Sequence, residues 1–320
     1  MDVLASGTPE QHAVIKLFYP HHWERMNAVG VEGSLAHYSS AEAALAILQN
    51  QEIWLRNTTV MNDYTEVQHG LDALFAAYSS ENGQAFQGAV NGVFDGLCKE
   101  VEDLFNGWQD ALKFETYITC MSEHRPGEDK VGRLSMWRAY GSTTGVALVV
   151  KAAPFRSDSQ VLKAYSTPVR YASSAGLEAD FLQLSASFGA SPQLLAGLGR
   201  EAVKGHLFNM YKWAALAVKH PGFEEEREWR IAYTPKMGGS DVIESAVKVV
   251  RGVPQIVHKL PLRRFEGEDF STDVRDILSH IIIGPSESGL ALYDAFRQVL
   301  TDLGVEDAAS KVVVSDIPVR

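Results

Sequence analysis

Residues 223–233, FEEEREWRIAY, show the alternation of a β-strand, and the rest of the chain can be organised around them. Successive side chains of a strand point to opposite faces, so Glu226, Glu228 and Arg230 are expected on one face. Trp229 falls on the other face, where it can pack into a core. The stretch therefore predicts a strand with one polar face and one buried face.

Further strands and helices are expected on both sides of this stretch. The run 146–150, VALVV, is apolar throughout and predicts a fully buried strand. Other strands are expected at 35–38, 53–55, 116–122, 161–171, 257–262, 281–284 and 311–315, and helices at 43–48, 67–112, 176–219 and 287–303. This order predicts an α+β fold. We expect an N-terminal extension at 1–34 and a single α+β domain at 35–320, with helical insertions near 67–112 and 176–219.

Composition narrows the class of protein. The chain has 320 residues, of which 46% are hydrophobic and 22% charged, as in ordinary globular proteins. Its net charge of -11 argues against a general polyanion-binding surface, because phosphate binding relies on Lys and Arg. Two cysteines without zinc-type spacing predict neither a disulfide framework nor a metal site. A polar start and the lack of an apolar run of ~20 residues lead us to expect a cytoplasmic protein.

The carboxylates of Glu226 and Glu228 are the strongest chemical signal. On one strand face they repel each other, which can raise one pKa for proton transfer, or they can bind one polar ligand together. The alternative is a solvated acidic run before an edge strand, because charge runs usually face solvent. No phosphate-binding glycine loop, dinucleotide motif or G-x-S-x-G elbow occurs, which argues against kinase and hydrolase templates.

A second polar group lies at residues 37–40, HYSS, where a strand is expected to lead into a helix. His37 and Ser39 point the same way on that strand, with Tyr38 between them. The amide N–H groups and the dipole of the helix N-terminus would suit a ribose or a phosphate. The structural alternative is a histidine packed in a hydrogen-bonded corner.

Residues 61–66, MNDYTE, form a polar loop with Asn62, Asp63 and Glu66. These side chains could contact a substrate. Asn and Asp in loops also form side-chain-to-backbone turns, and Glu66 could simply begin a helix.

Residues 133–141, RLSMWRAYG, bring arginines and aromatic residues close together. Arg133 and Arg138 offer anion recognition, and Trp137 or Tyr140 offers a stacking face for a base or a nicotinamide ring. The alternative is an ordinary helix in which Met136 and Trp137 are buried and the arginines are solvated.

The ordered set of motifs resembles an uncharacterised bacterial family catalogued only as a domain of unknown function. The resemblance extends over nearly the whole chain from about residue 35. Its motifs are 36–40 AHYSS, 47–48 IL, 53–55 IWL, 61–66 MNDYTE, 120–123 CMSE, 134–141 LSMWRAYG, 145–148 GVAL, 226–230 EREWR, 283–285 IGP and 315–320 SDIPVR.

The layout is also similar to the ADP-ribosyltransferase fold, which implies a split mixed or antiparallel β core with helical insertions. That resemblance implies NAD as a substrate, with His37 on the adenosine side and Ser135 or Tyr140 on the nicotinamide side. It further implies that Glu228, preceded by Glu226, stabilises an oxocarbenium-like centre. The central Ser-Thr-Ser element of arginine-modifying toxins is absent from this chain.

The leading hypothesis is an NAD-dependent ADP-ribosyltransferase-like enzyme that modifies a nucleic acid or a protein in toxin or phage-defence biology. The alternatives are a non-catalytic nucleotide- or partner-binding module, and a metal-dependent nuclease using Asp63, Glu66 and Glu228. The transferase hypothesis requires His37, Ser135 and Glu228 to line one cleft. The hypothesis assigns Glu228 and Glu226 to catalysis. It assigns to the cofactor His37, Tyr38, Ser39, Arg133, Ser135, Trp137, Arg138 and Tyr140, with Arg133 or Arg138 on the pyrophosphate. It assigns to the acceptor substrate Asn62, Asp63, Glu66 and Arg230.

Overall fold

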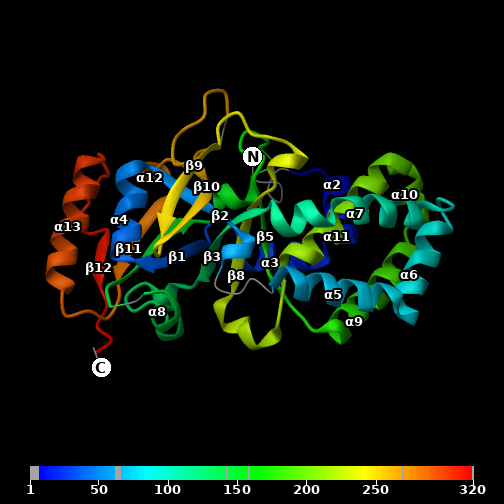
Figure 1. Ribbon diagram of the computed structural model, residues 1–320, viewed down its shortest axis with the longest axis horizontal. Helices are drawn as coiled ribbons and strands as arrows, with labels where there is room; N and C mark the ends of the chain where they lie inside the picture. Colours follow the sequence, from blue (N-terminus) through cyan, green and yellow to red (C-terminus); the bar gives the residue numbers. More distant parts are fainter. Residues whose placement is uncertain (1–6, 62–65, 142, 158, 269, 319–320) are drawn as a thin grey trace.

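The fold is built on a large mixed sheet with a lobe of helices at one end (Figure 1). The computed structural model describes residues 7–61, 66–141, 143–157, 159–268 and 270–318. The strands of the sheet are β1 (Ser34–Ser40), β2 (Glu52–Asn57), β3 (Tyr117–His124), β4 (Gly145–Lys151), β5 (Tyr165–Pro168), β8 (Glu228–Tyr233), β9 (Glu244–Val250), β10 (Val253–Pro261), β11 (Leu278–Ile283) and β12 (Val312–Val314). A separate two-stranded sheet pairs β6 (Arg170–Tyr171) with β7 (Val218–Lys219).

The sheet divides at β3. One edge of β3 pairs with β2 at Ile118 and with β1 from Ser122 onward, while the other edge pairs with β8 along its length. One arm then continues from β1 through β4 and β11 to β12, and the other continues from β2 through β10 to β9. Every pairing in the sheet is antiparallel except that of β11 with β12. The α+β class expected from the sequence is thereby confirmed.

The two faces of the first arm have different covers. One face packs under α4 (Ala41–Asn50) and α13 (Gly289–Asp302), with Leu35, Leu148 and Ile281 in its core. The opposite face packs under the short helix α8 (Leu134–Tyr140). The strand expected at 146–150 is present as β4 and is buried along that run, because both faces of the sheet are covered here.

The helical lobe is formed by three stretches far apart in the chain. Its members are α2 (Pro9–Phe18), α5 (Glu66–Ser79), α6 (Glu81–Asn91), α7 (Leu97–Phe114), α9 (Ser174–Gly189), α10 (Pro192–Leu198) and α11 (Arg200–Ala217). Phe86 and Phe188 lie in its core, which reaches the sheet at Ile118 and Ala232. The helices expected near 67–112 and 176–219 are present and pack on one another. Within the described residues, no helix is long and apolar enough to cross a membrane.

The remaining elements connect and cover the sheet. The helix α3 (Pro20–Val29) follows α2, and Arg25 on it forms an ion pair with Glu123 of β3. The short helices are η1 (Thr58–Val60), η2 (Pro126–Glu128), η3 (Ala153–Arg156), η4 (Pro221–Glu226), η5 (Pro235–Met237) and α12 (Val274–Ile277). Strand β9, which pairs with β10 across a turn at Arg251 and Gly252, was not expected from the sequence.

The expectation that Glu226 lies on the strand with Glu228 is wrong. Residues 221–226 form the turn η4, which begins at Pro221, and β8 begins at Glu228. Arg227 between them has φ 46° and ψ 50°, in the left-handed region, so the chain changes direction there. Local alternation alone does not reveal such a break, because a left-handed residue can be an arginine.

Trp137 of α8 packs against the backbone of glycines in the neighbouring strands. A Cβ atom added at Gly284 would lie 2.8 Å from Trp137 Cε3, and one at Gly145 would lie 3.0 Å from the same atom. The indole is 5% exposed, and its Nε1 donates to the carbonyl of Val131 at 2.9 Å. Trp137 is therefore a core residue that joins α8 to the sheet.

We expect Gly284→Ala to lower the free energy of unfolding by about 1–3 kcal/mol, because the new methyl group overlaps the indole of Trp137. Gly107→Ala is the matched control, since Gly107 lies in α7 with nothing within 4 Å of an added Cβ. That control should raise stability by about 0.5–1 kcal/mol. Urea unfolding of the three proteins measures both effects, and equal destabilisation by the two substitutions would contradict this packing.

Candidate functional site

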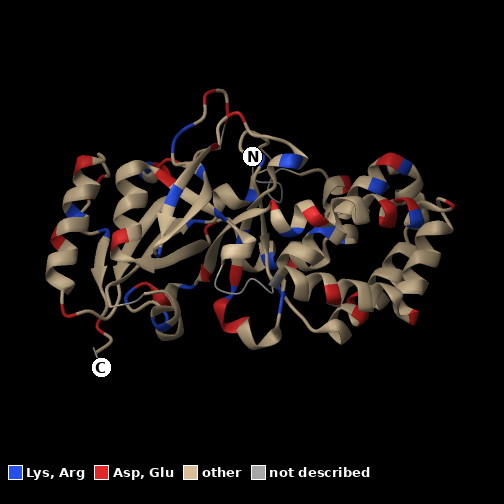
Figure 2. Ribbon diagram, in the orientation of Figure 1, with Lys and Arg blue, Asp and Glu red and all other residues tan. Residues whose placement is uncertain are grey.

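A cluster of charged side chains lies where η4 leads into β8. Glu226 and Glu228 both accept a hydrogen bond from Lys219 Nζ, at 2.7 Å and 3.1 Å. In Figure 2 the acidic residues of η4 mark the turn beside β8. The two carboxylates converge as the sequence suggested, although they do so through a turn and a shared cation rather than through one strand face.

Lys219 and Tyr171 reach the cluster from the small β6–β7 sheet, where they are paired in register. Lys219 is buried, and its ammonium also lies 4.8 Å from the ring centroid of Phe223. The Tyr171 hydroxyl accepts a hydrogen bond from the backbone N–H of Glu228 at 2.8 Å. Burial is the main reason that the pKa of Tyr171 is raised. Neither residue was expected from the sequence, because neither lies in a recognisable motif.

Arg230 holds the other oxygen of Glu228. Its Nε donates to Glu228 Oε1 at 2.6 Å, and its Nη1 donates to the carbonyl of Leu216 at 2.6 Å. Burial opposes ionisation of Glu228, but the positive charges of Arg230 and Lys219 outweigh it and lower its pKa to about 2. Glu228 is therefore a carboxylate at neutral pH, and Arg230 is its buried partner.

Tyr140 connects α8 to this cluster. Its hydroxyl donates to Glu226 Oε1 at 3.0 Å. The pKa of Tyr140 is raised, chiefly by burial and further by the negative charge of Glu226. The Glu226 side chain is 17% exposed and that of Glu228 only 7%, so Glu226 is the more accessible carboxylate.

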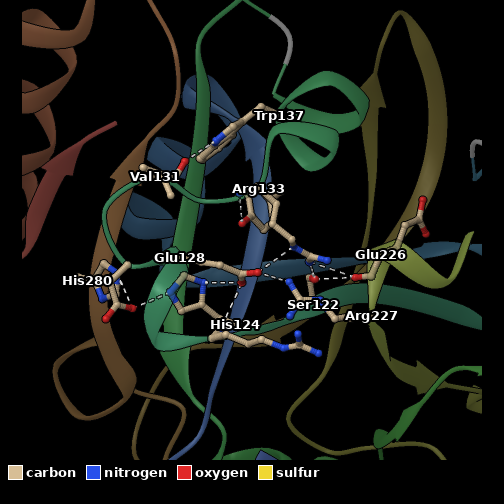
Figure 3. A network of polar contacts seen from close by, with 12 residues as sticks. Ser122, His124, Glu128, Val131, Arg133, Trp137, Glu226, Arg227 and His280 are labelled. Atoms are coloured by element: carbon tan, nitrogen blue, oxygen red, sulfur yellow. Dashed lines mark hydrogen bonds and ion pairs between the residues drawn. The ribbon is translucent and has the colours of Figure 1, made fainter. Parts of the chain in front are cut away.

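Arg133 braces the turn before β8 (Figure 3). Its guanidinium donates to the carbonyl oxygens of Glu225 and Glu226 and to the hydroxyl of Ser122. Ser122 in turn donates to the carbonyl of Glu226 at 2.6 Å. These guanidinium N–H groups of Arg133 therefore bind the protein itself. The sequence had led us to expect that Arg133 binds a pyrophosphate.

Tyr38, in the stretch 37–40, lies on the same face of the sheet as Glu228. Ala36, Ser122 and Glu228 form one row across β1, β3 and β8, and Tyr38 follows Ala36 on that face. The Tyr38 hydroxyl accepts from the backbone N–H of Arg133 at 3.1 Å, and its ring packs edge-on to Trp137.

The side chains of His37 and Ser39 alternate with Tyr38 and therefore point from the opposite face of β1. His37 lies where the sheet divides, and its Nδ1 is 2.9 Å from the carbonyl oxygen of Cys120. Burial lowers the pKa of His37. Ser39 is buried and donates to the carbonyl of Ser40, while Ser40 caps α4. The expected convergence of His37 with Glu228 is thus not found, because alternation along β1 separates the two side chains.

The other expected residues are dispersed. The Ser135 hydroxyl is buried without a hydrogen-bond partner among the described residues. Arg138 is exposed and borders a cavity of about 750 Å³ that Trp137, Pro285 and Pro318 also line. A second cavity, of about 600 Å³ and largely apolar, lies near α3 and β5 and is lined by neither Glu226 nor Glu228.

The loop at 61–66 adds little to the described site. Asn62 and Asp63 lie outside the described residues, and Glu66 is the first residue of α5. Of the carboxylates suggested for a nuclease metal, Glu228 alone has a described side chain. Both oxygens of Glu228 already bind cationic groups, on Arg230 and Lys219.

One family model, described as a protein of unknown function (DUF2971), matches residues 136–231. The matched stretch includes Tyr140, Lys219, Glu226 and Glu228, so it spans the charged cluster. No curated protein and no solved structure matches the chain. The resemblance to a family of unknown function is confirmed over this stretch.

We expect Glu228→Gln to lower the free energy of unfolding by about 3–5 kcal/mol near neutral pH, since it removes the buried carboxylate that pairs with Arg230 Nε. Because its pKa is lowered, Glu228 stabilises the fold at pH values above 4.5, the ordinary pKa of this group. That contribution is lost as the pH falls toward about 2. The difference from wild type should therefore shrink between these two pH values.

Chemical denaturation at a series of pH values measures this difference. Glu225→Gln on the same turn is the control, because Glu225 is exposed and its change should stay within about 0.5 kcal/mol. A Glu228→Gln protein as stable as wild type at pH 7 would show that the ion cluster contributes no net stability.

Proposed function

We propose that this chain is an NAD-dependent ADP-ribosyltransferase-like enzyme with Glu226 and Glu228 at its reacting centre. The observation that carries the proposal is the contact between Tyr140 and Glu226, at 3.0 Å. It joins the α8 motif to the Glu-x-Glu motif, which are far apart in the chain. These are the two motifs that the resemblance assigns to the nicotinamide side and to catalysis.

The charge state of the cluster suits this chemistry. In ADP-ribosyl transfer the bond between the ribose anomeric carbon and nicotinamide breaks, and its electron pair leaves with nicotinamide. The acceptor nucleophile then bonds to that carbon and releases its proton. A carboxylate stabilises the developing positive charge only when it is ionised. Glu228 has a pKa lowered to about 2, so it is ionised and adds negative charge beside Glu226, with which it shares Lys219.

We assign different roles to the two glutamates. Glu226 is the more exposed and lies at the end of η4, so it contacts the ribose. Glu228 is buried, holds Lys219, and through it positions Glu226. His37 lies on the other face of β1, so the cleft that the sequence-based hypothesis required from His37, Ser135 and Glu228 is not formed. The proposal rests instead on the α8 and Glu-x-Glu motifs. The acceptor, a nucleic acid or a protein in toxin or phage defence, remains part of the proposal.

We expect Glu226→Gln to reduce nicotinamide release from NAD by about 100- to 1000-fold, because the amide keeps the shape of the side chain but lacks its charge. Chromatography of purified protein incubated with NAD measures the product. Glu225→Gln, the exposed neighbour on the same turn, should release nicotinamide at the wild-type rate. Absence of release by wild type with any acceptor, or an active Glu226→Gln protein, would reject the assignment.

A non-catalytic nucleotide- or partner-binding module is the second candidate. The observation that favours it is that every carboxylate oxygen of the pair has a partner, from Tyr140, Lys219 or Arg230. Such a cluster is electrostatically satisfied without a substrate. This candidate predicts that wild type binds NAD in calorimetry without releasing nicotinamide, and that Arg138→Ala weakens the binding while Glu226→Gln does not.

A further inference from the structure

His124 and Asp129, five residues apart in the chain, meet the distant His280 beside the network around Arg133. His124 ends β3 and His280 lies on β11 (Figure 3). Asp129 follows η2. His124 Nε2 lies 2.8 Å from Asp129 Oδ1, and His280 Nε2 lies 3.8 Å from the same oxygen. One ligand-type atom from each residue lies within 4.8 Å of the other two.

Strand register explains how the two histidines meet. His124 is opposite Ser34 on β1, and His280 is opposite Val149 on β4, which in turn is opposite Ala36 on β1. Both histidines therefore project from the same face of the sheet, across the two strands between them. Ser34 and Ala36 carry small side chains, which leave room for the imidazole rings over β1.

The ring nitrogens are arranged as in a ligand set. His280 Nε2 is buried and has no hydrogen-bond partner among the described residues, while His280 Nδ1 lies 3.2 Å from the hydroxyl of Ser279. When Nδ1 carries the proton and donates to Ser279, Nε2 presents a lone pair toward Asp129. A buried nitrogen without a partner has a free-energy cost, which a ligand at this point would remove.

We propose that His124, Asp129 and His280 bind a divalent transition-metal ion of the Zn²⁺ type through His124 Nε2, His280 Nε2 and the carboxylate of Asp129. Two imidazoles and one carboxylate are a common set for Zn²⁺, with ligand bonds of about 2.0–2.2 Å. Mg²⁺ prefers oxygen ligands and is not expected to bind. The Asp129 side chain is 52% exposed, so ions can enter from solvent and water can complete the coordination.

Glu128 is placed to orient His124. Its Oε2 lies 3.8 Å from His124 Nδ1, which is otherwise without a partner in the described part of the chain. Once Nε2 binds an ion, Nδ1 carries the proton and can donate to this carboxylate after a small rotation, as metal-binding histidines commonly do. Glu128 also binds Arg227, so the site borders the turn that carries Glu226. The inference does not rest on the proposed function, because it concerns other residues.

Binding of Zn²⁺ and Co²⁺ to the full chain tests the site directly. The protein is first treated with a chelator that is then removed by dialysis, and each ion is titrated by calorimetry. We expect a single ion per chain, a higher melting temperature, and a Co²⁺ visible spectrum typical of nitrogen and oxygen ligands in a low-coordinate site. Mg²⁺ at the same concentration should have no effect.

Asp129→Ala and His280→Ala should each weaken binding by at least about tenfold and remove the Co²⁺ spectrum. Asp129 is exposed, so its variant is expected to fold even if His280→Ala does not. His12→Ala on α2 is the control and should bind as wild type does. Failure of wild type to bind, or undiminished binding by a folded Asp129→Ala protein, would overturn the proposal. Nicotinamide release is a separate measurement, so the two proposals can fail independently.

Discussion

The buried ion cluster of Glu228, Arg230 and Lys219 is the interaction on which the rest of the site depends. Glu228 and Arg230 are two residues apart on β8, and Lys219 reaches them from β7. Buried charges are costly unless they are paired, so these three side chains require one another. The carbonyl of Leu216, at the end of α11, also accepts from Arg230, which joins the helical lobe to the sheet. The cluster thus sets where η4 can place Glu226.

A second set of contacts positions the same turn from the other side. Arg133 precedes α8 and binds the backbone of η4, while Tyr140 at the end of α8 binds the Glu226 side chain. The packing of Trp137 against Gly145 and Gly284 holds α8 to the sheet. The candidate site therefore has one part anchored to the helical lobe and one part anchored to the sheet, and its geometry depends on both.

Most of the regular elements could be predicted from the sequence, whereas some local details could not. The apolar run at 146–150 was recognisable because a strand covered on both faces needs no polar alternation. Strand β9 was missed because it lies at the edge of the sheet, where the valines that alternate along it, such as Val247, are exposed. Trp137 was expected to bind a cofactor, yet it is buried because its indole packs closely on Gly145 and Gly284, which are distant in the sequence. The position of Arg227 in the left-handed region also has no local signal.

The sequence by itself determined the α+β class and the approximate strands and helices, and it marked Tyr140, Glu226 and Glu228 as candidate residues, which the structure brings into one cluster. Those features depend on local periodicity and residue chemistry, which are visible along the chain. Only the tertiary structure decided that Lys219 bridges both carboxylates and that the side chain of His37 lies on the opposite face of β1. The physical reason is that strand register and helix packing decide which distant side chains meet, and a shift of one residue reverses the face of every side chain in a strand.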